Sequence, residues 1–145
     1  MYKVVVVGTD GSETANTAVK AAADLARSMD ATLHVVSAFR TQTAGLAQVS
    51  GLPLVDTGAE DALRAEAARQ IGQKAIDTYA EGVQAQFHEG SGDAADVLID
   101  MAESLDADLI VVGSKGMRGA RRYLGSVPNS VCHGAPCAVL VVKTD

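Results

Sequence analysis

Four short segments of the chain are apolar at almost every position and rich in β-branched residues. A strand that helices cover on both faces needs such continuous apolarity, whereas a half-exposed strand alternates apolar and polar residues. The pattern therefore predicts four buried strands, at 3–8 (KVVVVG), 32–37 (TLHVVS), 108–113 (DLIVVG) and 138–143 (AVLVVK). A weaker segment, 83–89 (VQAQFHE), does alternate and predicts an edge strand with one half-solvated face.

Apolar residues recur at three- and four-residue steps in the stretches between these strands. They predict helices at 13–29, 60–79 and 93–105, and a last helix near 123–133. Ser12 is suited to cap the first helix, because its hydroxyl can accept from a backbone N–H of the first turn. Pro128 falls inside the last helix, where it either kinks the helix or displaces its start.

Strands and helices alternate along the whole chain. Such alternation, with right-handed crossovers, gives a parallel sheet with helices on both faces. The sequence thus predicts a single α/β domain over residues 1–145, built on an open five-stranded parallel sheet. The segment 39–58 has no periodicity and contains three glycines and one proline, and it is long for a simple connection. It is either a mobile lid over a site or a tolerated insertion.

Length and composition support one compact unit with a sizeable core. Of the 145 residues 48% are hydrophobic and only 3% aromatic, so the core must be built from Val, Leu, Ile and Ala. The formal charge of −6 repels nucleic acid phosphates and anionic membranes, so neither is an expected partner. Without an export signal or an apolar run of membrane-spanning length, the chain is expected in the cytoplasm, with Cys132 and Cys137 as reduced, at least half-buried thiols.

Two turns that follow predicted strands carry glycines and polar residues. They are 8–12 (GTDGS) and 113–119 (GSKGMRG). In an open α/β sheet, ligands bind at the carboxyl ends of the strands, where the strand order reverses. If the order is 3-2-1-4-5, the two turns face each other across that reversal and form one site.

The second turn has the residue types that bind phosphate. Gly113, Gly116 and Gly119 let backbone N–H groups approach a ligand closely, and four of the twelve Lys and Arg residues fall within 115–122. Such a cationic cluster suits phosphates, and Ser126 adds a hydroxyl near the last helix, whose N-terminal dipole favours an anion. Alternatively, the glycines only form a tight turn and the arginines a solvated helix face, since neither standard glycine-rich phosphate motif is present.

Asp10 and the histidines leave alternatives open. Asp10 directly follows the first strand and can accept from a nucleoside, or can bond its own backbone and cap the next helix. His34 lies in an apolar strand and is interpreted as a core residue, whereas His88 lies on the edge strand and His133 at a helix end. The spacing nominates neither a Ser-His-Asp arrangement nor a pair of catalytic carboxylates.

The stretch 113–130 (GSKGMRGARRYLGSVPNS) resembles the nucleotide loop of the universal stress protein family. That loop contains two glycines separated by two residues. About nine residues later a Gly-Ser or Gly-Thr pair follows. Here these positions are occupied by Gly113, Gly116, Gly125 and Ser126. Eight residues, rather than nine, lie between Gly116 and Gly125. VVVVGTDGSETANTAV is similar to the family's first strand and turn, and APCAVLVVK to its last strand.

The resemblance implies strand order 3-2-1-4-5 and a site for an adenine nucleotide. ATP is the expected ligand, AMP and cyclic AMP are alternatives, and Mg²⁺ is a candidate ion. Asp10 would contact the nucleoside, and Ser37 or Ala38 would flank adenine through the backbone. A homodimer is also implied, for which the last strand offers an unprotected edge. The positions expected to contact the nucleotide are Gly8, Thr9, Asp10, Ser37, Ala38, Gly113, Ser114, Gly116, Arg118, Gly125, Ser126 and Val127.

Three functions follow as hypotheses. The leading one is an ATP-binding protein of stress response or signalling that is not an enzyme or hydrolyses ATP only slowly. The second is a nucleotide hydrolase of related architecture, which needs an activated water or nucleophile. The third is a dimeric interaction module with a vestigial nucleotide site, which the shorter loop favours.

Overall fold

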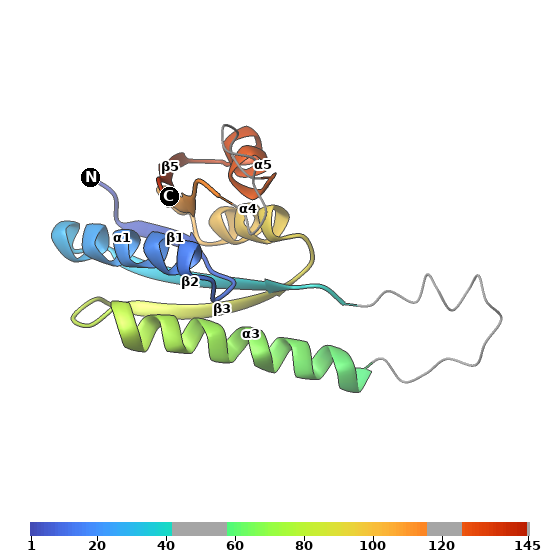
Figure 1. The fold of residues 1–145 in the computed structure, drawn as a ribbon. Coiled ribbons are helices and arrows are strands. Elements are labelled where there is room, and N and C mark those ends of the chain that lie inside the picture. The colour runs from blue at the N-terminus through green and yellow to red at the C-terminus, as the bar shows by residue number, and fades with distance from the viewer. Residues whose placement is uncertain (42–57, 116–125, 145) are drawn as a thin grey trace.

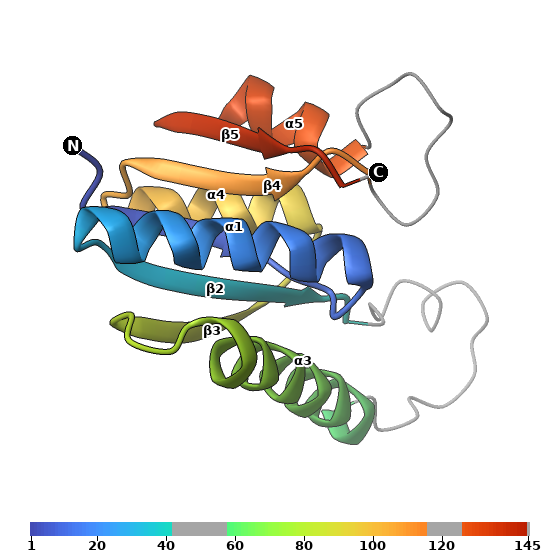
Figure 2. The same ribbon diagram turned by 60° about the vertical axis from the view of Figure 1, so that its left-hand side comes forward.

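The structure is a computed structural model that describes residues 1–41, 58–115 and 126–144. Its five strands form one parallel sheet in the order β3-β2-β1-β4-β5 (Figures 1 and 2). The predicted fold class and strand order are therefore confirmed. The strands are β1 (Val4–Gly8), β2 (Thr32–Phe39), β3 (Ala85–Ser91), β4 (Leu109–Gly113) and β5 (Ala138–Val142).

Helices cover both faces of the sheet, as the alternation of elements predicts. Helices α1 and α3 pack on one face, and α4 and α5 pack on the other (Figure 2). Because side chains alternate along a strand, Val5 and Val7 of β1 face α1, whereas Val6 faces α4. The helices are α1 (Glu13–Met29), α3 (Gly58–Tyr79), α4 (Ala94–Ser104) and α5 (Ser126–Gly134).

The core is built from small and branched side chains. The three central valines of β1, which point to both sides of the sheet, are fully buried, and α1 contributes four alanines and a valine with at most 1% exposure. Alanine lets a helix approach the sheet closely, so a chain with few aromatic residues can still fill its core. No helix within the described ranges is long and apolar enough to cross a membrane.

Local signals place most boundaries correctly. Ser12 caps α1, with its Oγ accepting from the N–H of Ala15 at 3.2 Å. Asp30 ends the same helix in the left-handed region at φ 50°. Pro128 is the third residue of α5, in the first turn, where a missing N–H costs no helical hydrogen bond. It therefore lies at the start of the helix and produces no kink there.

Several boundaries differ from the prediction by two residues; α3, for example, begins at Gly58 and β3 ends at Ser91. β2 continues to Phe39, pairing with Ser91, where a loop is predicted from residue 39. β3 begins at Ala85, two residues later than predicted, because Val83 still belongs to the turn after α3 and donates its N–H to the Ala80 carbonyl at 3.0 Å. The predicted alternation holds, since Val83 and Ala85 pack against the core beneath α1 and α3. Of the lid or insertion predicted at 39–58, residues 42–57 lie outside the described residues.

Candidate functional site

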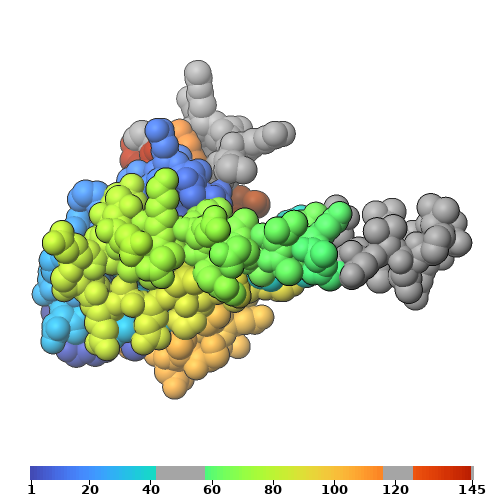
Figure 3. Space-filling view, turned by 90° about the horizontal axis from the view of Figure 1, so that it is seen from below, coloured from blue at the N-terminus to red at the C-terminus, as the bar shows by residue number. Residues whose placement is uncertain are grey.

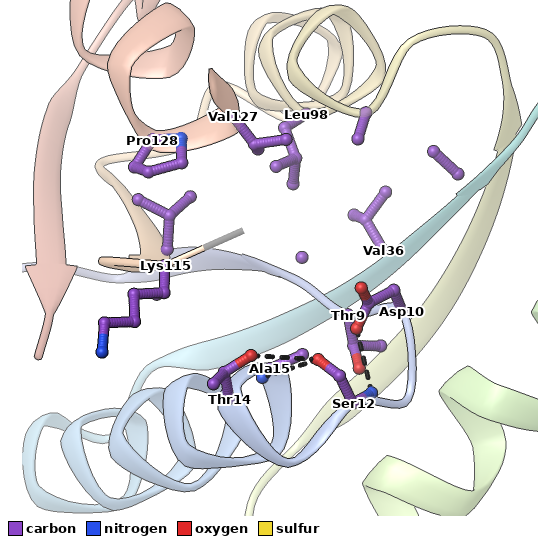
Figure 4. A pocket seen from close by; sticks show the side chains of 15 residues that line it. Thr9, Asp10, Ser12, Thr14, Ala15, Val36, Leu98, Lys115, Val127 and Pro128 are labelled. Atoms are coloured by element: carbon purple, nitrogen blue, oxygen red, sulfur yellow. Dashed lines mark hydrogen bonds between the residues drawn. The ribbon is translucent and has the colours of Figure 1, made fainter. Parts of the chain in front are cut away.

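The turn after β1 and the end of β4 line one cavity. Thr9 and Asp10 border it on one side and Lys115 on the other (Figure 4), and Gly8 and Gly113 also line it. β1 has β2 on one side and β4 on the other, so the strand order reverses at β1. The cavity thus lies where an open α/β sheet binds its ligands.

Small and branched side chains form the wall of the cavity deepest in the protein. Val36 and Ala38 come from the end of β2, Ala94 and Leu98 from α4, and Val112 from β4. All but Ala38 and Ala94 are buried, at 2% to 4% exposure. The lining is thus more apolar than polar and suits a flat, uncharged ring such as a base.

The turn after β1 is held by its own side chains. Thr9 is 6% exposed and donates its N–H to the Val36 carbonyl at 2.9 Å. Its Oγ1 accepts from the N–H of Gly11 at 3.1 Å, and Asp10 Oδ1 accepts from the N–H of Ser12 at 2.9 Å. Gly11 has φ +80°, which glycine adopts without strain. The turn is therefore fixed before any ligand arrives.

Asp10 has the structural role that the sequence left open, and its position at the cavity is compatible with the other role. Its Oδ1 bonds the backbone of the turn, which is the structural role. The residue is exposed at the cavity mouth, and a carboxylate has acceptor capacity on both oxygens. One carboxylate can thus hold the turn and still accept from a hydroxyl or amino group in the cavity.

The first turns of three helices border the cavity. Ser12, Thr14 and Ala15 belong to the start of α1, Ala94 is the first residue of α4, and Val127 and Pro128 lie in the first turn of α5. Backbone N–H groups at helix N-termini carry partial positive charge. Lys115 also borders the cavity. This arrangement favours an anionic group, although the chain as a whole is acidic.

Two predicted site residues have their side chains elsewhere. The Ser37 side chain is 2% exposed and lies on the sheet face opposite to Val36 and Ala38. The Ser114 N–H donates to the Val142 carbonyl at 2.7 Å, and its Oγ accepts from the N–H of Thr144 at 3.2 Å. Ser114 therefore joins the ends of β4 and β5 and does not line the cavity.

The remaining predicted residues divide into two groups. Gly8, Thr9, Asp10, Ala38, Gly113 and Val127 line the cavity, whereas Ser126 begins α5 without lining it. Gly116, Arg118 and Gly125 lie outside the described residues. Sequence reasoning missed Val36, Leu98 and Ala94. Strand alternation points to Val36 once Ala38 is chosen, but nothing local marks the α4 residues, which reach the cavity through the packing of α4 on the sheet.

The remaining candidate chemistry concerns metal binding and the two cysteines. Among the described residues, no group of three or more His, Cys, Asp or Glu side chains is placed to hold a metal ion. Cys132 is exposed and Cys137 half-buried, both as free thiols. The prediction of reduced thiols is consistent with this, but Cys132 is less buried than expected, because it lies on the outer side of α5.

Fold and cavity together define an open α/β domain with a cavity at the reversal of its strand order, where this class of protein binds ligands. The model of the universal stress protein family matches residues 1–143. Universal stress protein Rv1636 of Mycobacterium tuberculosis is 34% identical over 154 aligned positions, which cover 99% of this chain and 97% of that protein. The chain therefore belongs to the universal stress protein family.

Solved structures agree with this assignment. A universal stress protein crystallised in complex with cAMP has a TM-score of 0.66 and 29% identity, covering 99% of this chain and 98% of that chain. The structure of hypothetical protein MJ0577 has a TM-score of 0.79 at 22% identity, covering 100% and 98%, and shows the same fold.

Proposed function

We propose that this protein binds an adenine nucleotide in the cavity between the β1 and β4 turns, with ATP as the preferred ligand. The observation that carries the proposal is the division of the cavity into an apolar wall and a rim of helix N-termini with Lys115. A nucleotide has the same division, with a flat base at one end and phosphates at the other. The similarity to a universal stress protein crystallised with cAMP supports this class of ligand.

The size of the cavity supports a proposed arrangement of the nucleotide in the site. Its volume is about 130 Å³, less than the roughly 300 Å³ at which cavities begin to enclose a drug-sized ligand. The base and part of the ribose fill it, with Asp10 near the ribose. The phosphates extend past Lys115 toward the first turn of α5, where the helix dipole favours negative charge.

We further propose that the nucleotide acts as a signal in a cytoplasmic stress response rather than as a substrate, with at most slow hydrolysis. The ionisable side chains lining the described part of the cavity are Asp10 and Lys115. Asp10 already accepts from the Ser12 N–H, so it is a better hydrogen-bond acceptor for ribose than a base for water. Mg²⁺ would then bind chiefly through the phosphates of ATP, which it prefers to all-protein sites.

Calorimetric titration with ATP, AMP, cyclic AMP and GTP tests the proposal. We expect saturable binding of ATP at a Kd below about 1 mM, weaker binding of GTP, and weaker ATP binding when Mg²⁺ is chelated. At about 100 times its Kd, ATP should add about 2.7 kcal/mol to the free energy of unfolding. If none of the four nucleotides saturates the protein below about 1 mM, the proposal is wrong. Repeated turnover of ATP would favour the hydrolase instead.

A homodimer through β5 is the second part of the proposed function. β5 is an edge strand with β4 as its only neighbour in the sheet of described residues. Its Leu140 side chain is 40% exposed, and Val139, Val141 and Val142 are only half-buried. An apolar, unprotected edge strand readily pairs with a second copy across a two-fold axis.

Leu140→Lys is expected to convert the dimer into a monomer, because it would place two charged side chains in an apolar interface. Light scattering during size-exclusion chromatography measures the mass directly. Leu63→Lys is the matched control, since Leu63 is 71% exposed on α3. That helix packs against β2 and β3, at the opposite edge of the sheet from β5. A Leu140→Lys protein that stays dimeric, or a Leu63→Lys protein that dissociates, would place the interface elsewhere.

A further inference from the structure

Two histidines on adjacent strands bond each other near one edge of the sheet. His34 Nδ1 lies 2.8 Å from His88 Nε2, and the ring centroids are 5.0 Å apart. In the parallel register His34 lies opposite Gln86 and Val36 lies opposite His88. His34, Val36 and His88 therefore face the same side of the sheet, the side that α4 covers. His34 is 6% exposed and His88 is half-buried.

This histidine pair, His34 with His88, can keep its hydrogen bond in only some protonation states. A neutral imidazole offers one N–H and one acceptor nitrogen, whereas an imidazolium offers two N–H groups and no acceptor. The bond survives with no added proton or with one. A second proton turns both facing nitrogens into donors. It also places two positively charged rings with their centroids 5.0 Å apart.

Burial opposes protonation of the pair. Burial lowers the pKa of His34, and the positive charge of a protonated His88 lowers it further. Burial alone lowers the pKa of His88. The charged residues of α4 are Asp96, Asp100 and Glu103, all exposed on its outer side.

Within the described part of the chain, the strands on this face offer no charged side chain to offset a positive charge on the imidazoles. On the same face, β1 presents Val4 and Val6, and β3 presents Gln86 and Gly90, all uncharged. Glu89 lies on the opposite face of β3, bonded to Arg69 at 2.9 Å. Among the described residues, the two imidazoles thus have only each other as a hydrogen-bond partner.

The position of the pair determines what its protonation changes. β3 is the outermost strand and pairs with β2 alone, from Ala85 to Ser91. His88 lies in the middle of that pairing. Separation of β3 from β2 would expose both imidazoles to water, where they accept protons at an ordinary pKa of about 6.5.

We propose that the His34–His88 pair makes the attachment of edge strand β3 to the sheet sensitive to pH, so that β3 separates from β2 in mild acid. The closed edge binds fewer protons than the open one, so its stability is complete above about pH 6.5 and decreases as the pH falls below that value. The proposal concerns the protein without ligand and does not depend on which nucleotide it binds.

Amide hydrogen exchange, corrected for the intrinsic exchange rate at each pH, tests this in the full chain. At about pH 5.0 a free imidazole of pKa about 6.5 favours its protonated form about 30-fold. We therefore expect the protection factors of the 85–91 amides to fall about 30-fold for each imidazole that stays neutral in the closed edge, between about pH 7.5 and 5.0. The amides of β4, at the far side of β1, should change much less.

Glutamine variants separate this effect from general acid sensitivity. His88→Gln keeps a side chain that can bond His34 but takes up no proton, so its acid-induced fall should be smaller than that of the wild type. The double variant His34→Gln/His88→Gln should lose the difference between β3 and β4. His133→Gln, which removes an exposed imidazole on α5, should respond like the wild type.

Should the double variant fail to fold, His88→Gln and an NMR titration of the wild-type imidazoles decide the matter. We expect both imidazoles to titrate below about pH 6.5, together with the loss of β3 protection. Equal loss of protection in β3 and β4 would overturn the proposal. So would protonation of both rings with β3 still fully protected, or an undiminished response in His88→Gln.

Discussion

Ala38→Trp is expected to weaken adenine nucleotide binding at least about 100-fold, equivalent to about 2.7 kcal/mol, while the protein stays folded. Ala38 lies at the end of β2 with its side chain on the cavity wall, and it is only half-buried. An indole at this position would occupy the space that we assign to the base. The cavity is small, at about 130 Å³, so it has no room for both rings.

Calorimetric titration of the variant with ATP measures this loss. Ala62→Trp is the matched control, because Ala62 is exposed on α3 and takes the same bulky side chain outside the cavity. Circular dichroism of both variants shows whether the fold persists. If Ala38→Trp binds ATP like the control, the base does not occupy the wall formed by β2 and α4, although another site for the nucleotide would remain to be sought.

The position of the cavity could be predicted from sequence because it depends on topology. Strand order follows from the alternation of elements together with the family resemblance, and the order brings the β1 and β4 turns together. Both turns are also marked locally, by glycines and by polar residues directly after apolar strands. The part of the site at the carboxyl ends of β1 and β4 could therefore be predicted from the sequence.

The walls of the site could not be predicted in the same way. Ser37 and Val36 are neighbours in the chain, and only the face on which each side chain lies decides that Val36 borders the cavity. Within a uniformly apolar strand the sequence pattern does not reveal which residues face which layer. Leu98 and Ala94 enter the site through the packing of α4, which is a tertiary property.

The histidine pair shows the same limit. His34 was interpreted as a core residue and His88 as an edge residue, and both interpretations agree with their burial. Their contact depends on the β2–β3 register, which pairs Val36 with His88. A register one residue different would place His88 on the other face of the sheet. The predicted β3 began two residues early, so the pattern alone could not align the two rings.

Edge strand β3 is held on its other face by α3, which forms much of the surface in Figure 3. The helix passes over the strand at Gly72, and a Cβ built there would overlap the ring of Phe87. Arg69 of the same helix adds a bond to Glu89. The close approach of α3 to β3 therefore depends on the absence of a side chain at position 72.

Gly72→Ala is accordingly expected to lower the free energy of unfolding by about 1 to 3 kcal/mol, as overpacking does. In an unobstructed helix the same change would stabilise the protein by up to about 1 kcal/mol, so the sign of the effect identifies the contact. Urea denaturation of the wild type, Gly72→Ala, Phe87→Ala and the double variant gives the coupling. With the ring removed by Phe87→Ala, the alanine at 72 should become neutral or stabilising. If Gly72→Ala destabilises equally in both backgrounds, the Phe87 ring does not set the distance between α3 and β3, and the backbone of the helix itself must resist the substitution.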